Sequence, residues 1–442
     1  MNLINPREFK LEMLYVSSIL ENERCRFDDS DNISKSEQKQ IFENYCEALQ
    51  QTWNTNPEAC ILVLKSINKH IKSYGICQTL YSEQIAKIII ELLKCDNIQI
   101  VKDALVTVSN TFSNECKNQI QTILLNYNII DIVHELFGKW GTSIFTAIIF
   151  TISNMEATSK MCRDKILQIF KPIELEVLIS STVIHESCKN RCKIFLKKLC
   201  YYELDCEIAL EVFELLVNLK KYTGNWIFEP MGLCTRWINK NIIINQSLIE
   251  EAFVVLLSNE YDDIRSALIF IRYTTPEINE RIIQLLADER EEISALAIWS
   301  VINFIRFKGP EGVQISLSFN ILQIIQNAFC KGCYKQRIES AFCLCNIIKY
   351  STVTEINHII SLGLFTKLAE IFENCTNQEL SISIMNIFIK VLTLYRNEET
   401  IAEITRLFDE NDLYDIVVEE ENSNNIELSQ VAGKLLDILD KI

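Results

Sequence analysis

Apolar residues recur along most of this chain every three or four positions, and short polar breaks separate the resulting segments. That spacing gathers apolar side chains on one face of an α-helix, whereas a half-buried strand would alternate strictly. The segments are roughly 10–17 residues long, as globular helices are; clear examples are residues 57–71, 82–93, 98–111, 248–257 and 263–273. The pattern predicts an all-helical bundle or solenoid without a long linker.

Local signals indicate where the regular part begins and ends. Ser34 and Glu37 have the Ser-x-x-Glu spacing of a capping box, which predicts a helix that starts here and runs to Trp53. An asparagine-rich loop at residues 419–425 precedes one last helix, residues 426–442. We therefore expect an irregular N-terminal segment, residues 1–40, and a repeat solenoid over residues 41–442, with about 8–10 repeats and the last helix as a cap.

Internal repetition favours the solenoid over the bundle. Five segments share a small residue, a bulky residue and then Asn or Tyr four positions later: DALVTVSN, AIIFTISN, ALIFIRY, ALAIWSVIN and SAFCLCN, which end at Asn110, Asn154, Tyr273, Asn303 and Asn346. The first two end 44 residues apart and the last two 43 residues apart. Armadillo and HEAT repeats are about 40–47 residues long. We therefore predict an all-α, right-handed α-solenoid of armadillo-type three-helix repeats.

Two stretches depart from this period. Only 30 residues separate Tyr273 from Asn303, so one repeat is trimmed or the register slips there. Between Asn154 and Ala267 the pattern is hard to see. We expect that stretch to be degenerate or differently built.

Composition supports the helical prediction and narrows the function. The 442 residues include only 10 Gly and 6 Pro, which strand-and-turn folds need often. The formal net charge is −16, from 43 basic and 59 acidic residues. Since nucleic-acid binding depends on a basic face, we expect no nucleic-acid partner. An acidic balance suits a basic partner, or it simply keeps the protein soluble.

Seventeen cysteines raise the question of the compartment. Several lie in apolar helical runs, among them Cys192, Cys200 and Cys345, where a thiol behaves as a small hydrophobe. Residues 1–15 carry charges unlike a secretion signal, and no apolar stretch approaches the roughly 20 residues that span a bilayer. We therefore expect free thiols in a reducing compartment and no membrane partner.

Neither a metal site nor a catalytic site is expected. Cys330 and Cys333 have the C-x2-C spacing with which zinc sites begin, but Cys343 and Cys345 stand two apart on a helix and point to different faces. The four His residues are scattered singly, and no phosphate-binding glycine loop or nucleophile motif is recognisable. We predict a binding protein that is not an enzyme and has no cofactor.

Several segments resemble the importin-α family, the armadillo adaptors that carry basic nuclear-localisation signals. Residues 108–136 are similar to its Asn-ended groove helix and the two helices that follow. Tyr273 and the Asn-Glu-Arg-Ile after it resemble the family repeat in which Tyr replaces the groove Asn, and residues 339–372, 383–392 and 413–439 resemble its late repeats. The resemblance covers about half of the chain. It implies an import adaptor of cytoplasm and nucleus that binds basic, extended cargo segments in a concave groove and partners a carrier of the importin-β type.

In that family, Trp-x-x-x-Asn pairs on the third helices hold the peptide. Residues four apart share a helix face, so the ring supplies a wall for a Lys or Arg stem beside an amide for the peptide backbone. Trp299 and Asn303 form the intact pair, and two other pairs have Phe in place of Trp. The resemblance implies a peptide-binding set that includes two acidic neighbours: Asp103, Asn110, Phe150, Asn154, Tyr273, Trp299, Asn303, Glu339, Phe342 and Asn346.

A rival hypothesis is a general armadillo scaffold whose partner is unrelated to import signals. Its asparagines would satisfy backbone groups between stacked helices. One observation separates the two hypotheses: an import adaptor exposes the four asparagines in one line on its concave face, whereas a scaffold buries them between repeats. The chain also departs from the family at two points. Lys390 stands where an Asn is expected, and residues 1–40 lack the basic cluster that binds the carrier.

Overall fold

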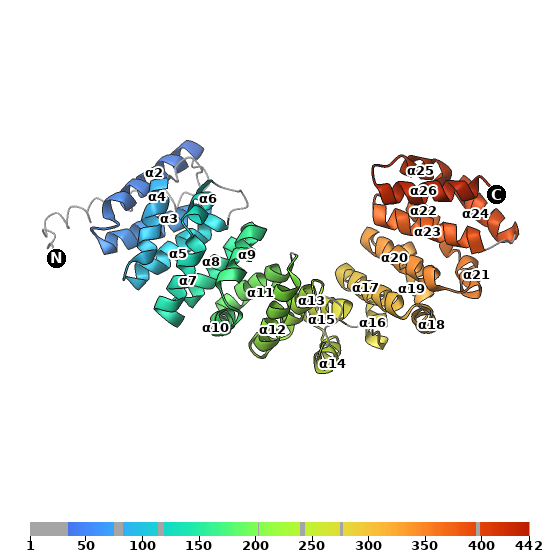
Figure 1. Cartoon of the computed structure of the whole chain (residues 1–442), viewed down its shortest axis with the longest axis horizontal. Coiled ribbons are helices and arrows are strands. Elements are labelled where there is room, and N and C mark those ends of the chain that lie inside the picture. Colours follow the sequence, from blue (N-terminus) through green and yellow to red (C-terminus); the bar gives the residue numbers. More distant parts are fainter. Residues whose placement is uncertain are drawn as a thin grey trace. The chain divides into compact units, whose positions relative to one another are not determined.

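The computed structural model describes residues 34–74, 83–113, 119–201, 203–238, 244–274, 277–394 and 398–441. All regular structure in these ranges is helical, and none of their residues forms a strand (Figure 1). The all-α prediction is confirmed. The chain divides into two compact units, Met1–Lys240 and Asn241–Ile442, called the first and second unit.

The first unit is a succession of amphipathic helices. In α4, for example, the buried side chains Ile85, Ile89 and Leu92 follow the spacing of one helix face. Two short 3₁₀ turns, η1 (Gly141–Ser143) and η2 (Asn225–Ile227), link longer helices. The α-helices are α2 (Lys35–Thr52), α3 (Pro57–Tyr74), α4 (Glu83–Lys94), α5 (Ile98–Phe112), α6 (Gln119–Asn126), α7 (Ile129–Trp140), α8 (Phe145–Thr158), α9 (Lys160–Ile169), α10 (Pro172–Val183), α11 (Glu186–Tyr201), α12 (Cys206–Thr223) and α13 (Phe228–Thr235).

The second unit is also a succession of α-helices. Its longest helices are apolar on most of their surface because they pack against neighbours on several sides. The helices are α14 (Gln246–Val255), α15 (Tyr261–Thr274), α16 (Glu280–Leu285), α17 (Glu291–Lys308), α18 (Pro310–Ser318), α19 (Ile321–Lys331), α20 (Tyr334–Tyr350), α21 (Val353–Ser361), α22 (Leu364–Glu373), α23 (Gln378–Leu394), α24 (Glu398–Glu410), α25 (Leu413–Glu421) and α26 (Ile426–Leu439).

The helices group into repeats of three or two. Three-helix repeats are α6–α8 and α9–α11 in the first unit, and α18–α20, α21–α23 and α24–α26 in the second. Between Asn154 and Ala267 the chain passes through one three-helix repeat and then the pairs α12–α13 and α14–α15, which explains why the period is hard to see there. The 30-residue interval contains the pair α16–α17, so the expectation of a trimmed repeat is confirmed.

A left-handed residue separates the first and second helices in four of the three-helix repeats. Asn128, Asn320 and Asp412 have φ of 54°, 57° and 49°, and Gly363 has φ of 69°. Among side-chain-bearing residues, Asn and Asp tolerate this region best, and Gly adopts it freely. Each is followed at once by two apolar residues that are mostly buried in the next helix. A left-handed residue followed by two apolar residues is thus a local sequence signal of the repeat.

The predicted capping box at the start of α2 is confirmed. The Glu37 amide donates to Ser34 Oγ at 3.3 Å, and the Ser34 amide donates to Glu37 Oε2 at 2.9 Å. The helix ends with Trp53 as its C-cap. Residues 1–33, which make up most of the expected irregular segment, lie outside the described residues.

One acidic side chain is buried in the core of the first unit. Glu156, on α8, is fully inaccessible, and neither of its carboxyl oxygens has a hydrogen-bond partner among the described residues. Burial raises the pKa of Glu156 well above its ordinary value of 4.5, although the positive charges of Lys198 and Arg163 act in the opposite direction. A carboxylate without hydrogen bonds is costly in such a place, so the native state favours the protonated form.

This burial predicts a pH-dependent stability. Because the native pKa of Glu156 lies above the unfolded value, its contribution is fully present below pH 4.5 and is lost as pH rises through the native pKa. Glu156→Gln removes that loss, and the variant should melt a few degrees higher than the wild type near pH 8, with a smaller gain near pH 5. Thermal unfolding followed by circular dichroism at both pH values measures the difference.

The matched control is Glu211→Gln on α12, where the side chain is exposed. It should change the melting temperature little and equally at both pH values. A gain for Glu156→Gln that is the same at both pH values would show that the ionised carboxylate is not the cause.

Candidate functional site

Within each unit, the last helix of each repeat, here called the closing helix, packs on the closing helix of the next repeat. The row of closing helices is α3, α5, α8, α11 and α13 in the first unit, and α15, α17, α20, α23 and α26 in the second. Hydrogen bonds show that neighbours in the row run parallel: the Tyr261 hydroxyl meets Glu292 near the starts of α15 and α17, and Asn303 reaches the Arg272 carbonyl near their ends. All ten residues of the predicted peptide-binding set lie on these rows.

The four asparagines are not equally accessible. Asn154 is 7% and Asn346 6% exposed, whereas Asn110 and Asn303 are half-buried. The expectation that all four amides are exposed is therefore wrong for Asn154 and Asn346. Packing between successive closing helices covers these two amides.

The amides bond mainly to neighbouring closing helices. Asn154 Nδ2 donates to the Ser109 carbonyl at 2.9 Å, and Asn303 Nδ2 donates to the Arg272 carbonyl at 2.6 Å. Carbonyls near a helix end lack partners in their own helix, so a side chain from the next helix that supplies a donor stabilises the junction. For Asn154 and Asn303, the alternative role of satisfying backbone groups between helices is confirmed.

Lysine performs the same task at position 390, where an asparagine was expected. Its ammonium donates to the carbonyls of Ile348, Lys349 and Ser351 at 2.7, 2.8 and 3.2 Å, at the C-terminal end of α20. Burial lowers the pKa of Lys390, but three acceptors and the negative end of the helix favour its charged form. The substitution thus keeps the contact between closing helices.

The polar groups around Asn110 bond to one another. Asn110 Nδ2 donates to Asn68 Oδ1 at 3.2 Å, and Asn68 Nδ2 donates to the Asp103 carbonyl at 3.1 Å. The Asp103 carboxylate accepts a bond from Gln99 at 3.0 Å. Val106, one turn before Asn110, is 40% exposed. This end of the row offers an apolar side chain beside an amide and a carboxylate.

Trp299 is at the centre of an aromatic and guanidinium cluster. Its half-buried ring lies 5.8 Å from the Phe342 ring. The guanidinium carbons of Arg272 and Arg306 lie 4.5 and 5.7 Å from the Trp299 ring centre, within cation–π range. The Arg272 guanidinium also lies 5.0 Å from the ring of Tyr273. Two cations of the protein itself therefore occupy the surroundings of the ring.

Glu339 belongs to the same cluster. Burial raises the pKa of Glu339, while a hydrogen bond with the Trp299 side chain and the charges of Arg272 and Lys335 act to lower it. The carboxyl group thus lies beside the indole and near the protein's own bases.

The first unit contains a related cluster at Phe150. The Arg191 guanidinium, from α11, lies 4.9 Å from the Phe150 ring and donates from Nη1 to Asn154 Oδ1 at 2.8 Å. In the second unit, Arg306 Nε donates to Asn346 Oδ1 at 2.9 Å. Both buried asparagines therefore hold an arginine that also contacts an aromatic ring. The i, i+4 pattern describes residues on one helix, so it contains no signal for these arginines. Arg191 lies on α11 and bonds to Asn154 on α8, and Arg306 lies on α17 and bonds to Asn346 on α20.

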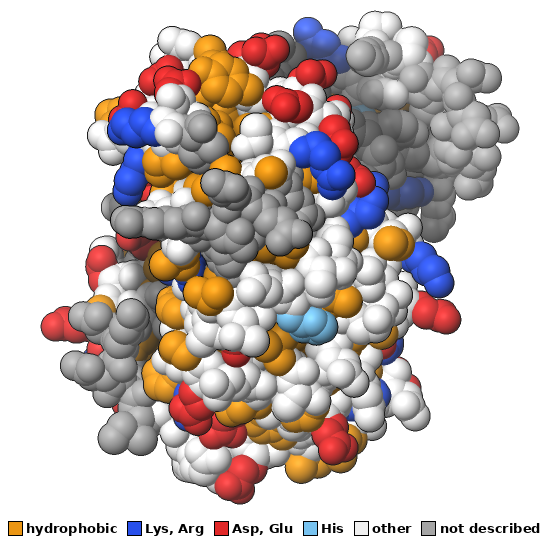
Figure 2. All heavy atoms as spheres, turned by 90° about the vertical axis from the view of Figure 1, so that its right-hand side faces the viewer, with side chains coloured by type: hydrophobic (Ala, Val, Ile, Leu, Met, Phe, Trp, Pro, Cys, Tyr) orange, Lys and Arg blue, Asp and Glu red, His pale blue; other side chains and the backbone are white. Residues whose placement is uncertain are grey.

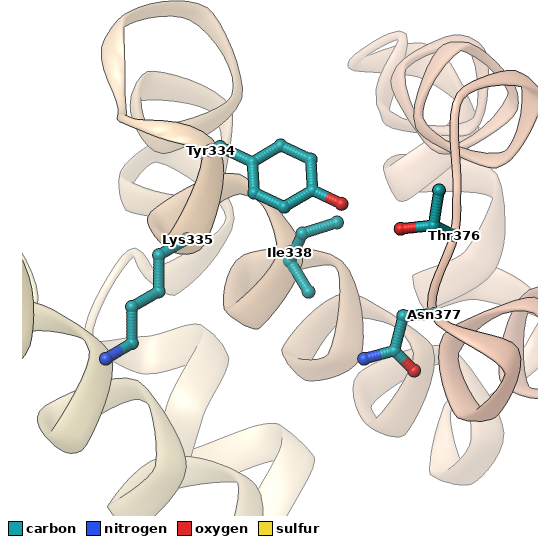
Figure 3. A pocket seen from close by; sticks show the side chains of 5 residues that line it. All are labelled: Tyr334, Lys335, Ile338, Thr376 and Asn377. Carbon is teal, nitrogen blue, oxygen red and sulfur yellow. The ribbon is translucent and has the colours of Figure 1, made fainter.

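A pocket of about 390 Å³ opens beside the row in the second unit, between the first turn of α20 and the residues that lead into α23. Figure 3 shows the Tyr334 phenol turned towards Thr376 across Ile338, whereas the Lys335 side chain extends away from them. Asn377, also in the lining, caps α23 by accepting from the Leu380 amide at 3.2 Å. The pocket offers an apolar wall with hydroxyl and amide groups at its edge.

Within the described residues all cysteines are free, and Cys192, Cys200 and Cys345 are buried in helices, as predicted. Cys333 caps α20 by accepting from the Gln336 amide at 3.4 Å. No three His, Cys, Asp or Glu residues gather as metal ligands in the ranges that the structure covers. None of the helices described is both long and apolar enough to span a bilayer. Acidic and basic side chains are interspersed over the face in Figure 2.

Comparison with known proteins establishes the fold. No family model and no curated protein matches the chain. An engineered protein from a structural genomics consortium is similar over 90% of this chain and 98% of its own, with 13% identity and a TM-score of 0.63. A structure from a study of a phosphorylation switch in the interaction between cadherin and beta-catenin covers 99% of both chains, with 12% identity and a TM-score of 0.52. The protein has an armadillo-like, all-α repeat fold.

Proposed function

We propose that this protein is a non-enzymatic, armadillo-like scaffold that binds an extended segment of another protein along its closing helices. The cluster at Trp299 carries the proposal. It combines a half-buried indole, a second ring at Phe342 and positioned guanidinium groups on consecutive closing helices. Aromatic side chains and Arg are the residues that contribute most to protein interfaces, since they combine apolar area with directional hydrogen bonds.

The repeated architecture favours an extended ligand. Parallel helices about 8–10 Å apart present similar groups at regular intervals, and an extended chain that rises about 3.3 Å per residue meets a new helix every three residues. The pocket at Tyr334 and the exposed side chains of Val106 and Phe307 add apolar contacts on the same helices. A ligand of this kind needs no enclosed cavity.

The second candidate is an importin-α-like adaptor for basic localisation segments, acting in cytoplasm and nucleus with an importin-β-type carrier. The intact pair Trp299–Asn303 favours it, because the ring is accessible in part. The arginines beside Trp299 weigh against it, since an incoming cation would meet two like charges at the ring it needs. We therefore place the general scaffold first.

A peptide library with no bias in charge, displayed and selected against the full chain, tests the proposed function. Selected peptides should lose affinity about fivefold when Val106→Gln or Phe307→Gln is introduced, because each substitution removes an exposed apolar contact on a closing helix. Fluorescence anisotropy gives the dissociation constants. Glutamine is neutral, so the comparison does not depend on the charge of the ligand.

The control is Ile173→Gln on α10, which is not a closing helix and where the side chain is 62% exposed. It should leave affinity unchanged. Peptides that lose affinity with Ile173→Gln but not with the two closing-helix variants would place binding elsewhere and remove the proposal.

A further inference from the structure

We propose that the segments bound along the closing helices are acidic: Arg306 binds their carboxylates in the second unit, and Arg191 forms an equivalent, separate site in the first unit. This inference rests on the proposed function and specifies the chemistry of its ligand. It reverses the charge that the sequence resemblance implies. The reason lies in what already occupies the aromatic rings and the asparagine amides.

Arg306 is held in a defined orientation at the end of α17. Its Nε donates to Asn346 Oδ1 at 2.9 Å, and its guanidinium carbon is 5.7 Å from the Trp299 ring centre. The side chain is nevertheless exposed, and it forms no ion pair with any residue that the structure describes. Fixing Nε in this way leaves the two terminal nitrogens, Nη1 and Nη2, as a planar fork. That fork matches the two oxygens of a carboxylate.

Arg191 has a related arrangement in the first unit, but it bonds through Nη1, so the free edge of its guanidinium is formed by Nε and Nη2. Its Nη1 donates to Asn154 Oδ1 at 2.8 Å, and its guanidinium carbon is 4.9 Å from the Phe150 ring. It is half-buried and likewise has no carboxylate partner in the described part of the chain. Two independent sites thus share an asparagine oxygen, an aromatic ring and an arginine without a counter-ion.

These contacts use up the groups that a cationic ligand would require. A Lys or Arg of a basic segment would need the ring face for its stem and the asparagine oxygen for its N–H groups. The protein's own arginines hold both oxygens and lie at both rings. An anionic side chain would instead meet guanidinium N–H donors that the protein already holds in place. Its binding would therefore cost little entropy for ordering those donors.

The distribution of charges along the row also favours an acidic ligand. In the second unit, the ends of consecutive closing helices carry Arg272, Arg306 and Lys349, while the acidic residues of α15 and α17 lie in their first turns. Because these helices run parallel, the bases lie along one edge of the row. Such bases commonly complement helix dipoles. Arg306, however, bonds to a side chain of the neighbouring helix rather than to its own terminal carbonyls.

Two peptides of about 12 residues, long enough to cross roughly four helices, test the inference. One carries Glu at alternate positions and the other carries Lys at the same positions, with an otherwise identical sequence. Fluorescence anisotropy with the full chain at low salt should give saturable binding of the Glu peptide and much weaker binding of the Lys peptide. Added salt should weaken the Glu complex, because screening reduces the attraction of exposed charges.

Arginine variants separate a specific site from general charge. Arg306→Ala should weaken binding of the Glu peptide at the second-unit site about tenfold, and Arg191→Ala should do the same at the first-unit site, so that only the double variant weakens both sites. Arg306→Lys keeps the charge but loses the planar fork, so its affinity for the Glu peptide should lie between those of the wild type and Arg306→Ala. Arg406→Ala, at an exposed ion pair on α24, removes the same charge elsewhere and should have little effect. Arg306→Ala should also strengthen the Lys peptide, since it removes a positive charge from the Trp299 ring.

Tighter binding of the Lys peptide by the wild type would overturn the inference, and so would a Glu complex that is indifferent to Arg306→Ala and Arg191→Ala. Absence of binding by both peptides would overturn it as well. The library selection then decides separately: binders sensitive to Val106→Gln or Phe307→Gln keep the scaffold function with a ligand of other chemistry.

Discussion

Phe388→Ala is expected to destabilise the second unit by about 3–5 kcal/mol, as large-to-small changes of buried aromatic residues do. Phe388 lies on α23 and is 1% exposed. Its ring packs edge-on against Phe408 of α24 at 5.1 Å and against Phe365 of α22 at 6.1 Å. Removing it leaves a cavity where three helices from two successive repeats meet. Urea unfolding should show the loss, and hydrogen exchange should place it in α22, α23 and α24.

Phe307→Ala is the matched control, because Phe307 on α17 is 71% exposed in the same unit. It should change stability by no more than about 0.5 kcal/mol. Phe388→Leu should cost less than Phe388→Ala, since leucine refills most of the space. If Phe388→Ala cost no more than the surface control, the three-ring contact would not hold these repeats together.

The repeat fold could be predicted from sequence because its signals are local. Apolar periodicity fixes each helix, the Ser34–Glu37 pair marks the start of α2, and the asparagine-ended segments repeat at the armadillo period. The sequence contains a further local signal. A left-handed Asn, Asp or Gly, such as Asn128 or Asn320, followed by two apolar residues, marks the boundary between the first two helices of a repeat. It would have set the register of the three-helix repeats.

The chemistry of the closing helices could not be read in the same way. The i, i+4 rule correctly put Phe342 and Asn346 on one helix, but it contains nothing about Arg306, which reaches Asn346 from another repeat. Burial of the amide follows from that contact. Lys390 likewise departs from the asparagine pattern, although it reaches the same class of backbone carbonyls through a longer side chain. That Lys can replace Asn at such a position becomes visible only when the backbone carbonyls of the neighbouring helix are in place.

A second large effect is expected at Arg163, because it is a fully buried charge in the first unit. Its guanidinium donates to Asp164 Oδ1 at 3.0 and 2.6 Å and to the Glu203 carbonyl at 2.9 Å. Its positive charge also acts to lower the pKa of buried Glu156, against the larger effect of burial. Replacing such an ion pair entirely by apolar groups can be neutral, whereas removing one partner leaves the other groups without compensation.

Arg163→Met keeps apolar volume but removes every one of these contacts, and it should cost about 3 kcal/mol in urea unfolding at neutral pH. Arg406→Met, at an exposed position on α24, should cost almost nothing. If part of the cost arises from Glu156, then adding Glu156→Gln should recover part of the loss, because a neutral amide does not need the guanidinium charge. The double-mutant cycle isolates this coupling. Additive losses would show that Arg163 stabilises the first unit independently of Glu156, and a single variant as stable as the wild type would contradict the role of Arg163 altogether.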